Sequence, residues 1–274
     1  MSPRSEQTEM RIPAEAPPGE QSLTPIIMFG GVLTLKQLLP AYALLLRSDK
    51  RTNPPSRERF MPIPKGSLGH PADMQEQFES FLVRAYERIG QPLVVGGHSL
   101  GGLAATKVAL SHPDKVASVV CLAGAQDGVK HKTPSARALE LYIGRRDITE
   151  LIYHDSDYIQ QHRQSMAANW PAEVPLHLLS ATADDIIWDH GLSVELPAGQ
   201  MPVRRIVAPG WAERLGIMQR MNPSRPADTV RLASDRPTGH VDLPLAGAVI
   251  RYVQELRGQS IGHEESGGPQ LDVA

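Results

Sequence analysis

One serine of this chain stands in a setting that favours nucleophilic chemistry. Ser99 is the third residue of the run GHSLGG at 97–102, and a helical pattern over 103–110 follows it. A turn this tight between a strand and a helix strains the backbone of the central residue. It also leaves no room for a Cβ two residues before or after the serine, which explains Gly97 and Gly101. Such a turn would raise the hydroxyl above the sheet edge, where a helix N-terminus favours developing negative charge.

The elements that must position this serine can be read from the alternation of apolar runs and helical patterns. This alternation predicts an α/β fold, with a parallel sheet between helices. The strands are expected at 25–29, 59–63, 92–96, 116–122, 176–180 and 229–233. The helices are expected at 35–46, 71–89, 103–110, 136–142, 158–168 and 245–256.

The serine motif resembles the nucleophile elbow of α/β-hydrolases, especially that of bacterial lipases and esterases. The alternating elements extend this resemblance over residues 25–258. The run AGAQDG at 123–128 is similar to the Gly-x-Pro-His-x-Gly segment of bacterial lipases, although it lacks the Pro and the His. The resemblance implies an α/β-hydrolase fold with a mainly parallel sheet of about six strands, flanked by helices. It also implies a small helical cap at about 126–172, which would exclude water and select substrates.

The chain order of this family, nucleophile then acid then histidine, directs the search for the acid. Asp184 follows the predicted strand that ends at Ser180, and two isoleucines follow it after one residue, as in the acid loop of the family. The resemblance implies that Asp184 orients the imidazole and stabilises the imidazolium. Asp185 is a near alternative and Asp189 a more distant one, and an aspartate here could also cap the next turn.

The same resemblance places the general base between the last strand and the last helix, where His240 lies. Of the ten histidines, only His240 and His263 follow the last predicted strand, and His263 lies in a polar tail. An imidazole can accept the serine proton near neutral pH and return it to the leaving group. His240 is therefore the expected base.

Two backbone amides should bind the oxyanion of the tetrahedral intermediate. One is expected from Leu100, the residue after the nucleophile. The other should follow the first strand, where the family reads His-Gly-x and this chain reads Gly-Gly-Val at 30–32. Val32 is the matching donor, because a backbone amide does not depend on the missing histidine side chain.

Composition limits the domains and the location of the protein. We expect one domain at 25–261, with an insertion at about 191–226 that carries a strand at 204–207 and a helix near 211–221. Residues 1–24 are expected to form a flexible arm and residues 262–274 a flexible tail. The arm lacks the apolar core of a signal peptide, and no stretch approaches the roughly 18 apolar residues of a membrane span. A cytoplasmic protein without an integral membrane segment is therefore expected.

Charge and cysteine content exclude some other classes of function. The net charge of −2 and the pI of about 6.6 give no electrostatic footprint for nucleic acid. The single cysteine, Cys121, permits no internal disulfide and is expected to be buried in a strand. The run HDSD at 154–157 has two types of metal ligand, but no third ligand is placed by spacing, so a solvated loop is expected.

These residues predict a serine hydrolase that needs no metal and no organic cofactor. The expected substrate is a small-molecule carboxylic ester with an apolar acyl group, cleaved through an acyl-enzyme on Ser99. Thioester hydrolysis, acyl transfer, peptide cleavage and carbon–carbon bond hydrolysis are alternatives on the same fold. A protein of another class, a non-catalytic binder of a small ligand, is disfavoured because a serine, an acid and a histidine all stand at the expected places. The oligomeric state is left open.

Overall fold

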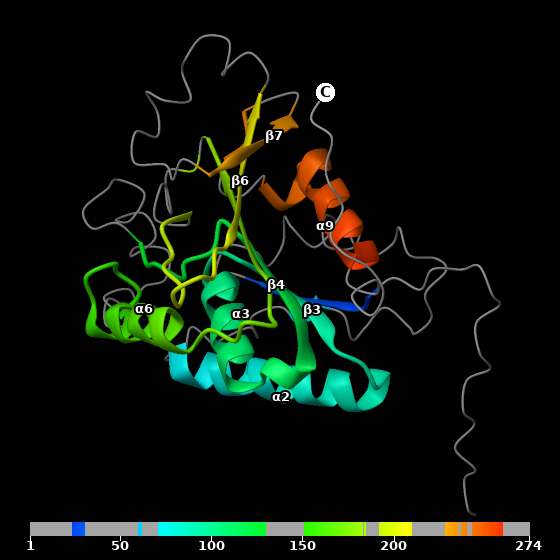
Figure 1. Ribbon diagram of the computed structural model, residues 1–274, viewed down its shortest axis with the longest axis vertical. Helices are drawn as coiled ribbons and strands as arrows, with labels where there is room; N and C mark the ends of the chain where they lie inside the picture. Colours follow the sequence, from blue (N-terminus) through cyan, green and yellow to red (C-terminus); the bar gives the residue numbers. More distant parts are fainter. Residues whose placement is uncertain are drawn as a thin grey trace, which may run out of the picture.

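A parallel sheet between two layers of helices forms the body of the protein (Figure 1). The computed structural model describes residues 24–30, 60–61, 71–129, 151–182, 184, 192–209, 228–234, 237–239 and 243–259. In these ranges the strands are β1 (Ile26–Phe29), β2 (Phe60–Met61), β3 (Leu93–His98), β4 (Val116–Leu122), β5 (Leu176–Ala181), β6 (Val203–Pro209) and β7 (Val230–Ser234). The α-helices are α2 (Pro71–Ile89), α3 (Leu100–Ser111), α6 (Asp157–Asn169) and α9 (Gly247–Gln259). Short 3₁₀ turns lie at Pro113–Lys115 and Leu243–Leu245.

The seven strands described here are hydrogen-bonded in the order β2-β1-β3-β4-β5-β6-β7, and every neighbouring pair is parallel. The register sets Phe29 beside Gly97 and His98 beside Leu122. Because parallel strands end at the same edge, the segments after β1, β3, β4 and β5 meet there. That edge is where ligands bind in open parallel sheets.

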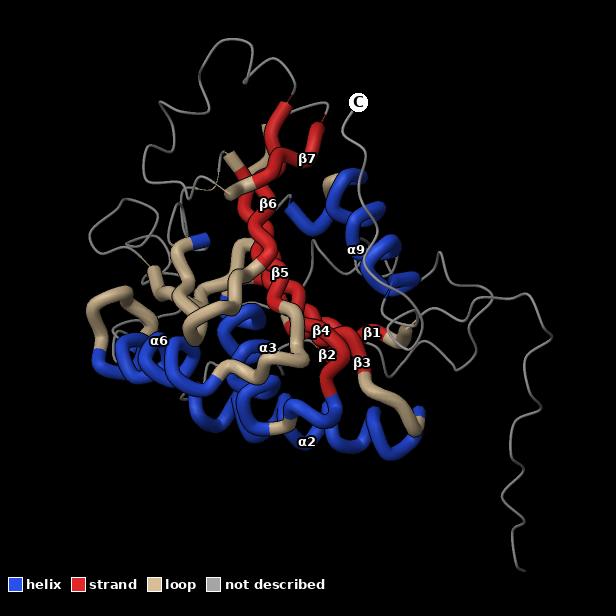
Figure 2. The backbone as a smooth tube through the Cα atoms, in the orientation of Figure 1, coloured by secondary structure: helices blue, strands red, loops and turns tan. Residues whose placement is uncertain are grey.

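Side chains alternate between the two faces of the sheet and build two separate cores. On one face, Val95 and Cys121 join a core that includes buried residues of α2, α3 and α6. On the other face, Val94 and Val120 pack with buried residues of α9. Figure 2 shows the same division, with α9 on one side of the twisted sheet and the other three helices on the opposite side.

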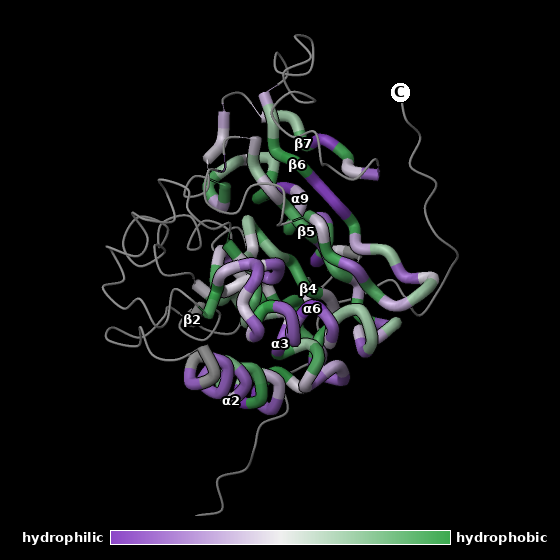
Figure 3. The backbone as a smooth tube through the Cα atoms, turned by 90° about the vertical axis from the view of Figure 1, so that its left-hand side faces the viewer, coloured by the Kyte–Doolittle hydropathy of each residue, from purple (hydrophilic) through white to green (hydrophobic). Residues whose placement is uncertain are grey.

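The helices differ in how much of their surface is buried. Helix α2 is amphipathic: Phe78 and Leu82 are buried, and the Phe78 ring stacks on Phe29 at a centroid distance of 4.4 Å. Hydrophilic residues lie on the outer turns of α2, whereas β4 is hydrophobic (Figure 3). Helix α3 is buried along most of its length, because it packs against the sheet, α2 and α6. Among the described residues, no helix combines the length and the apolar character that a membrane crossing requires.

The predicted elements can now be compared with the observed ones. Every predicted strand within the described residues is present, and 204–207 is the centre of β6. The sheet has seven strands rather than about six, because β6 lies inside it, between β5 and β7. The predicted helices at 71–89, 103–110, 158–168 and 245–256 correspond to α2, α3, α6 and α9. Those at 35–46, 136–142 and 211–221 lie outside the described residues, as do the arm 1–24, except Thr24, and the tail 262–274.

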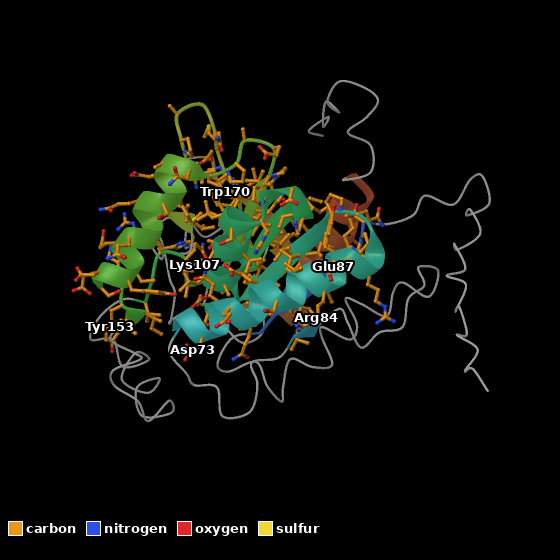
Figure 4. All side chains as sticks on the ribbon, turned by 90° about the horizontal axis from the view of Figure 1, so that it is seen from below. Asp73, Arg84, Glu87, Lys107, Tyr153 and Trp170 are labelled. Atoms are coloured by element: carbon orange, nitrogen blue, oxygen red, sulfur yellow. The ribbon has the colours of Figure 1, made fainter. Side chains whose placement is uncertain are left out.

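Helix α6 lies within the segment predicted to form a cap, residues 126–172, but it packs into the domain body. Its residues Ile159, His162 and Met166 are buried, and two of them belong to the same core as α2 and α3. Figure 4 shows α6 alongside α2 and α3, with Lys107 between the helices. Helix α6 is therefore part of the helical layer of the domain body. A cap formed by residues 130–150 stays a prediction, because these residues lie outside the described part of the chain.

Candidate active site

Ser99 is the last residue before α3 and has a backbone conformation that residues other than glycine rarely adopt. Its φ is 55° and its ψ is −123°. Among the described residues, the only other non-glycine residue with positive φ is Ala123, which follows the neighbouring strand β4. A non-glycine residue with such φ and ψ angles destabilises the fold by of order 1–3 kcal/mol, and the conformation persists only where its surroundings enforce it. The observed backbone is the strained strand-to-helix turn predicted from the sequence.

Hydrogen bonds on both sides of the serine enforce this conformation. The Ser99 N–H donates to the carbonyl oxygen of Leu122, at 3.0 Å. The Ser99 carbonyl oxygen accepts from the N–H groups of Gly102 and Ala125, both at 2.9 Å. Leu122 is the last residue of β4, Ala125 lies in the loop after it, and Gly102 lies in the first turn of α3. The turn is therefore held from within α3 and from the end of β4.

Steric contacts explain why the turn is made of glycines. A Cβ on Gly97 would lie 2.0 Å from the carbonyl oxygen of Gly101. A Cβ on Gly101 would lie 2.2 Å from the carbonyl oxygen of Phe29, at the end of β1. A Cβ on Gly102 would lie 2.6 Å from the Cα of Gly124. All three obstacles are backbone atoms, which cannot move aside as a side chain would.

This geometry leaves the Ser99 hydroxyl suited to nucleophilic attack. Ser99 is partly exposed, whereas the residues on either side of it are buried. Its side chain forms no capping hydrogen bond with the first turn of α3. The amide of Leu100 begins α3, where a helix dipole favours negative charge. The first strand ends beside the turn, as the Gly101–Phe29 contact shows, so the loop that carries Val32 starts next to Ser99. Val32 itself lies outside the described residues.

The predicted acid reaches the same edge of the sheet. Asp184 follows β5, is only 4% exposed, and its N–H donates to the carbonyl oxygen of Ala181 at 3.2 Å. Strand β5 lies two strands from β3, roughly 10 Å across the sheet. Asp184 is thus buried at the edge that carries Ser99. The alternatives Asp185 and Asp189 lie outside the described residues.

The loop of the predicted base also begins at this edge. Thr238 is buried after β7, and the carbonyl oxygen of Gly239 accepts from the N–H of Leu243, just before α9. His240 lies outside the described residues, so its distance from Ser99 stays a prediction. The neighbouring histidine of the motif, His98, is fully buried at the end of β3.

A charged cluster near the site was missed by the sequence reasoning. Asp127, in the loop after β4, is 2% exposed, and its Oδ1 lies 2.9 Å from Nε of Arg163 on α6. The Nδ1–H of His154 donates to the carbonyl oxygen of Asp127 at 2.8 Å. The sequence predicts a solvated loop at 154–157, whereas His154 is half-buried against Asp127 and Arg163. Among the described residues it belongs to no group that could hold a metal ion. The signal available in the sequence was an aspartate within an otherwise small and apolar segment, which needs a cationic partner when buried.

Comparisons with known proteins give a family match over part of the chain and distant structural similarities. Residues 65–169, which include α2, the serine turn and α6, match the family model described as "Serine aminopeptidase, S33", a family of hydrolases. The monoacylglycerol lipase of Paleococcus ferrophilus is 16% identical, with 87% of this chain and 96% of that chain covered and a TM-score of 0.45. A thermophilic esterase from Thermogutta terrifontis is 14% identical, with 86% and 90% covered and a TM-score of 0.45. None of the curated proteins matches the sequence. The protein has the α/β-hydrolase fold that the serine motif predicted.

Proposed function

We propose that this protein is a serine hydrolase that cleaves carboxylic esters through an acyl-enzyme on Ser99. The observation that carries the proposal is the strained backbone of Ser99 between β3 and α3, in a turn where backbone atoms leave no room for a Cβ on Gly97 or Gly101. Backbone strain of this kind clusters at functional sites, and at Ser99 it presents a hydroxyl at a helix N-terminus. The match of residues 65–169 to a hydrolase family supports the same chemistry.

The proposed mechanism assigns one role to each residue. His240 accepts the Ser99 proton while the serine oxygen attacks the ester carbonyl, and Asp184 stabilises the imidazolium. The amides of Leu100 and Val32 donate to the oxyanion. The imidazolium then protonates the leaving alcohol as the carbon–oxygen bond breaks. Water activated by His240 attacks the acyl-enzyme and releases the acid, which restores the Ser99 hydroxyl.

The substrate is proposed to be a small-molecule ester with an apolar acyl group. The test is hydrolysis of p-nitrophenyl esters from acetyl to palmitoyl, by the wild type and by Ser99→Ala. We expect activity that peaks at one chain length and is lost in the variant, with unchanged circular dichroism as the control for folding. A folded wild type without activity on any of these esters would contradict the proposal of ester hydrolysis.

Peptide cleavage is the second candidate, because the matching family is described as serine aminopeptidases. Amino-acid p-nitroanilides, whose scissile bond is an amide, belong in the same set of assays. Faster turnover of an anilide than of every ester would replace esterase by aminopeptidase activity without changing the role of Ser99. A thioester substrate tests the thioesterase alternative in the same way.

A further inference from the structure

We propose that Arg163 is a positioning residue for the nucleophile: its ion pair with Asp127 holds the loop after β4 in the position from which Ala125 fixes the backbone of Ser99. This proposal rests on the proposed function, because it assigns Arg163 a part in the reactivity of Ser99. Neither the serine motif nor the predicted triad includes a residue of α6.

The loop after β4 is held at its far end by a set of polar contacts. Asp127 carries a buried carboxylate, and Arg163 Nε lies 2.9 Å from it. Nη1 of the same guanidinium lies 3.4 Å from Nε2 of His154, and the Nδ1–H of that ring donates to the Asp127 carbonyl oxygen. Gln160, one turn earlier on α6, donates through Nε2 to the carbonyl oxygen of His154 at 2.8 Å. Helix α6 and the segment before it thus hold both the side chain and the backbone of Asp127.

Backbone contacts tie the same loop to the segment that begins α6. The N–H of Val129 donates to the carbonyl oxygen of Ile152, and the N–H of His154 donates to the carbonyl oxygen of Val129. Gly128 has a φ of +82°, and a Cβ there would lie 2.6 Å from the Cα of His154. No side chain fits between the two segments, so the loop cannot shift toward α6 without breaking these contacts.

The near end of the loop holds the nucleophile. Ala123 has a φ of 45°, and its N–H donates to the carbonyl oxygen of Leu179 on β5 at 2.7 Å. A turn from Ala125 to Gly128 is closed by a 2.9 Å hydrogen bond between the Gly128 N–H and the Ala125 carbonyl oxygen. Asp127 lies inside this turn, and the N–H of Ala125 at its start donates to the Ser99 carbonyl oxygen. The position of Asp127 therefore sets the orientation of an amide that fixes Ser99.

Burial makes this arrangement depend on the positive charge of Arg163. A carboxylate that is 2% exposed needs a cationic partner, and the Arg163 guanidinium lies 2.9 Å from Oδ1, closer than His154 Nδ1, which lies 3.6 Å from Oδ2. Without the guanidinium the carboxylate would lose this closer partner and would turn toward water. That movement would rotate the turn and withdraw the Ala125 amide from Ser99. A nucleophile misplaced by about 1 Å loses on the order of a hundredfold in rate.

The guanidinium can be replaced experimentally, because it is accessible. Arg163 is 35% exposed and lines a cavity of about 150 Å³ together with Gln126 and Met166. A cavity of this size can accept a small organic molecule. Truncation in Arg163→Ala would extend this cavity to the carboxylate of Asp127, where ethylguanidinium could bind.

The experiment compares the wild type with Arg163→Gln, Arg163→Lys and Arg163→Ala, the last with and without ethylguanidinium. The readouts are the rate of fluorophosphonate labelling at Ser99, the values of kcat and KM on the best ester, and the melting temperature. Arg204→Gln is the matched control. This substitution breaks the 2.6 Å ion pair of Arg204 with Asp228 and the hydrogen bonds of Arg204 to the carbonyl oxygens of Leu192 and Val194. None of these partners lies in the loop after β4.

We expect Arg163→Gln to lower the labelling rate and kcat by about 10- to 100-fold with little change in KM, whereas Arg204→Gln lowers only the melting temperature. Lysine at 163 or added ethylguanidinium should restore most of the rate. Labelling at the wild-type rate in Arg163→Gln would overturn the proposal, as would a defect that neither cation restores.

Hydrogen–deuterium exchange keeps this test separate from the test of the proposed function. If the wild type does not label, ester hydrolysis by Ser99 fails, but exchange still reports on the loop. We expect faster exchange in the peptide that contains Ser99 and in the peptide that contains Ala125 in Arg163→Gln than in Arg204→Gln. Equal exchange in the two variants would show that Arg163 does not hold the nucleophile turn.

Discussion

The carbonyl oxygen of Ser99 accepts a hydrogen bond of 2.9 Å from the N–H of Ala125, which joins the turn after β3 to the loop after β4. A second bond, from the Ser99 N–H to Leu122, joins the same two parts of the chain. The strained residue is thus held on both of its peptide groups by the neighbouring strand and its loop. Reactivity at Ser99 should therefore depend on residues that lie far from it in the sequence.

Substitution of Gly97 should be much less tolerated than substitution of a helical glycine. We expect Gly97→Ala to lower the free energy of unfolding by about 1–3 kcal/mol or more, because its Cβ would meet the backbone of Gly101. Gly247→Ala is the control, since the nearest atom to its Cβ would be a flexible Arg251 nitrogen at 3.5 Å and alanine favours a helix. Urea unfolding measures both changes. Equal stabilities for the two variants would contradict the steric account of the turn.

The identity of the triad acid can be decided by two neighbouring substitutions. Asp184→Asn should lower kcat on the best ester by on the order of 10⁴-fold, because the amide no longer holds the imidazole in its reactive tautomer. Asp185→Asn should leave kcat within a few-fold of the wild type. The reverse order of effects in steady-state assays would assign the role to Asp185.

The protein should lose stability in acid because two histidines are buried in neutral form. Burial, with a smaller effect of Lys107, lowers the pKa of His162 to about 3. Burial, with a smaller effect of Arg205, lowers the pKa of His177 to about 4. An unfolded histidine titrates near 6.5, so as the pH falls the unfolded chain binds these protons first. Their contribution to stability is complete above about pH 6.5 and is lost as the pH falls toward 4.

Urea unfolding at pH 7 and pH 5 measures this loss. Each histidine should account for about 2 kcal/mol of the decrease between these values. In His162→Gln, the contribution of the two histidines to the decrease in unfolding free energy between pH 7 and pH 5 should be about halved. An unchanged difference between pH 7 and pH 5 in His162→Gln would show that His162 does not titrate in this way. His162 lies 3.0 Å from the Thr106 hydroxyl, between α6 and α3, so its protonation should loosen the contact of these two helices.

The single cysteine should be unreactive in the folded protein. Cys121 is fully buried in β4, its thiol lies 3.6 Å from the Gly102 carbonyl oxygen, and burial raises the pKa of the thiol above its ordinary value. An aromatic disulfide reagent at pH 8 should therefore not react with the native protein. After denaturation, its reaction with Cys121 should release one equivalent of the reagent's aromatic thiolate per chain. Rapid release from the native protein would contradict the buried position of Cys121.

Local patterns predicted the elements of the fold well, for physical reasons. Strands β1, β3, β4 and β5 are short apolar runs buried on both faces, and α2 has a clear apolar stripe that includes Phe78 and Leu82. The serine turn was predictable because backbone strain demands glycine at fixed spacing. The helical role of α6 was also within reach, since Ile159, His162 and Met166 follow a helical spacing that is typical of a buried stripe.

Contacts between distant segments could not be predicted in the same way. The pairing of Asp127 with Arg163 joins two elements through a loop, and no local pattern indicates which cation meets which carboxylate. The place of β6 inside the sheet likewise depends on pairing with β5 and β7 rather than on its own sequence. His240 and Val32 lie outside the described residues and stay predictions from the family resemblance.

The central claim is that Ser99 is the nucleophile, and the most direct test is covalent labelling with a fluorophosphonate followed by mass spectrometry of the intact chain and its peptides. We predict one adduct per chain, located on Ser99, and none on folded Ser99→Ala. An unlabelled folded wild type, an adduct on another residue, or an adduct that persists in Ser99→Ala would contradict the claim.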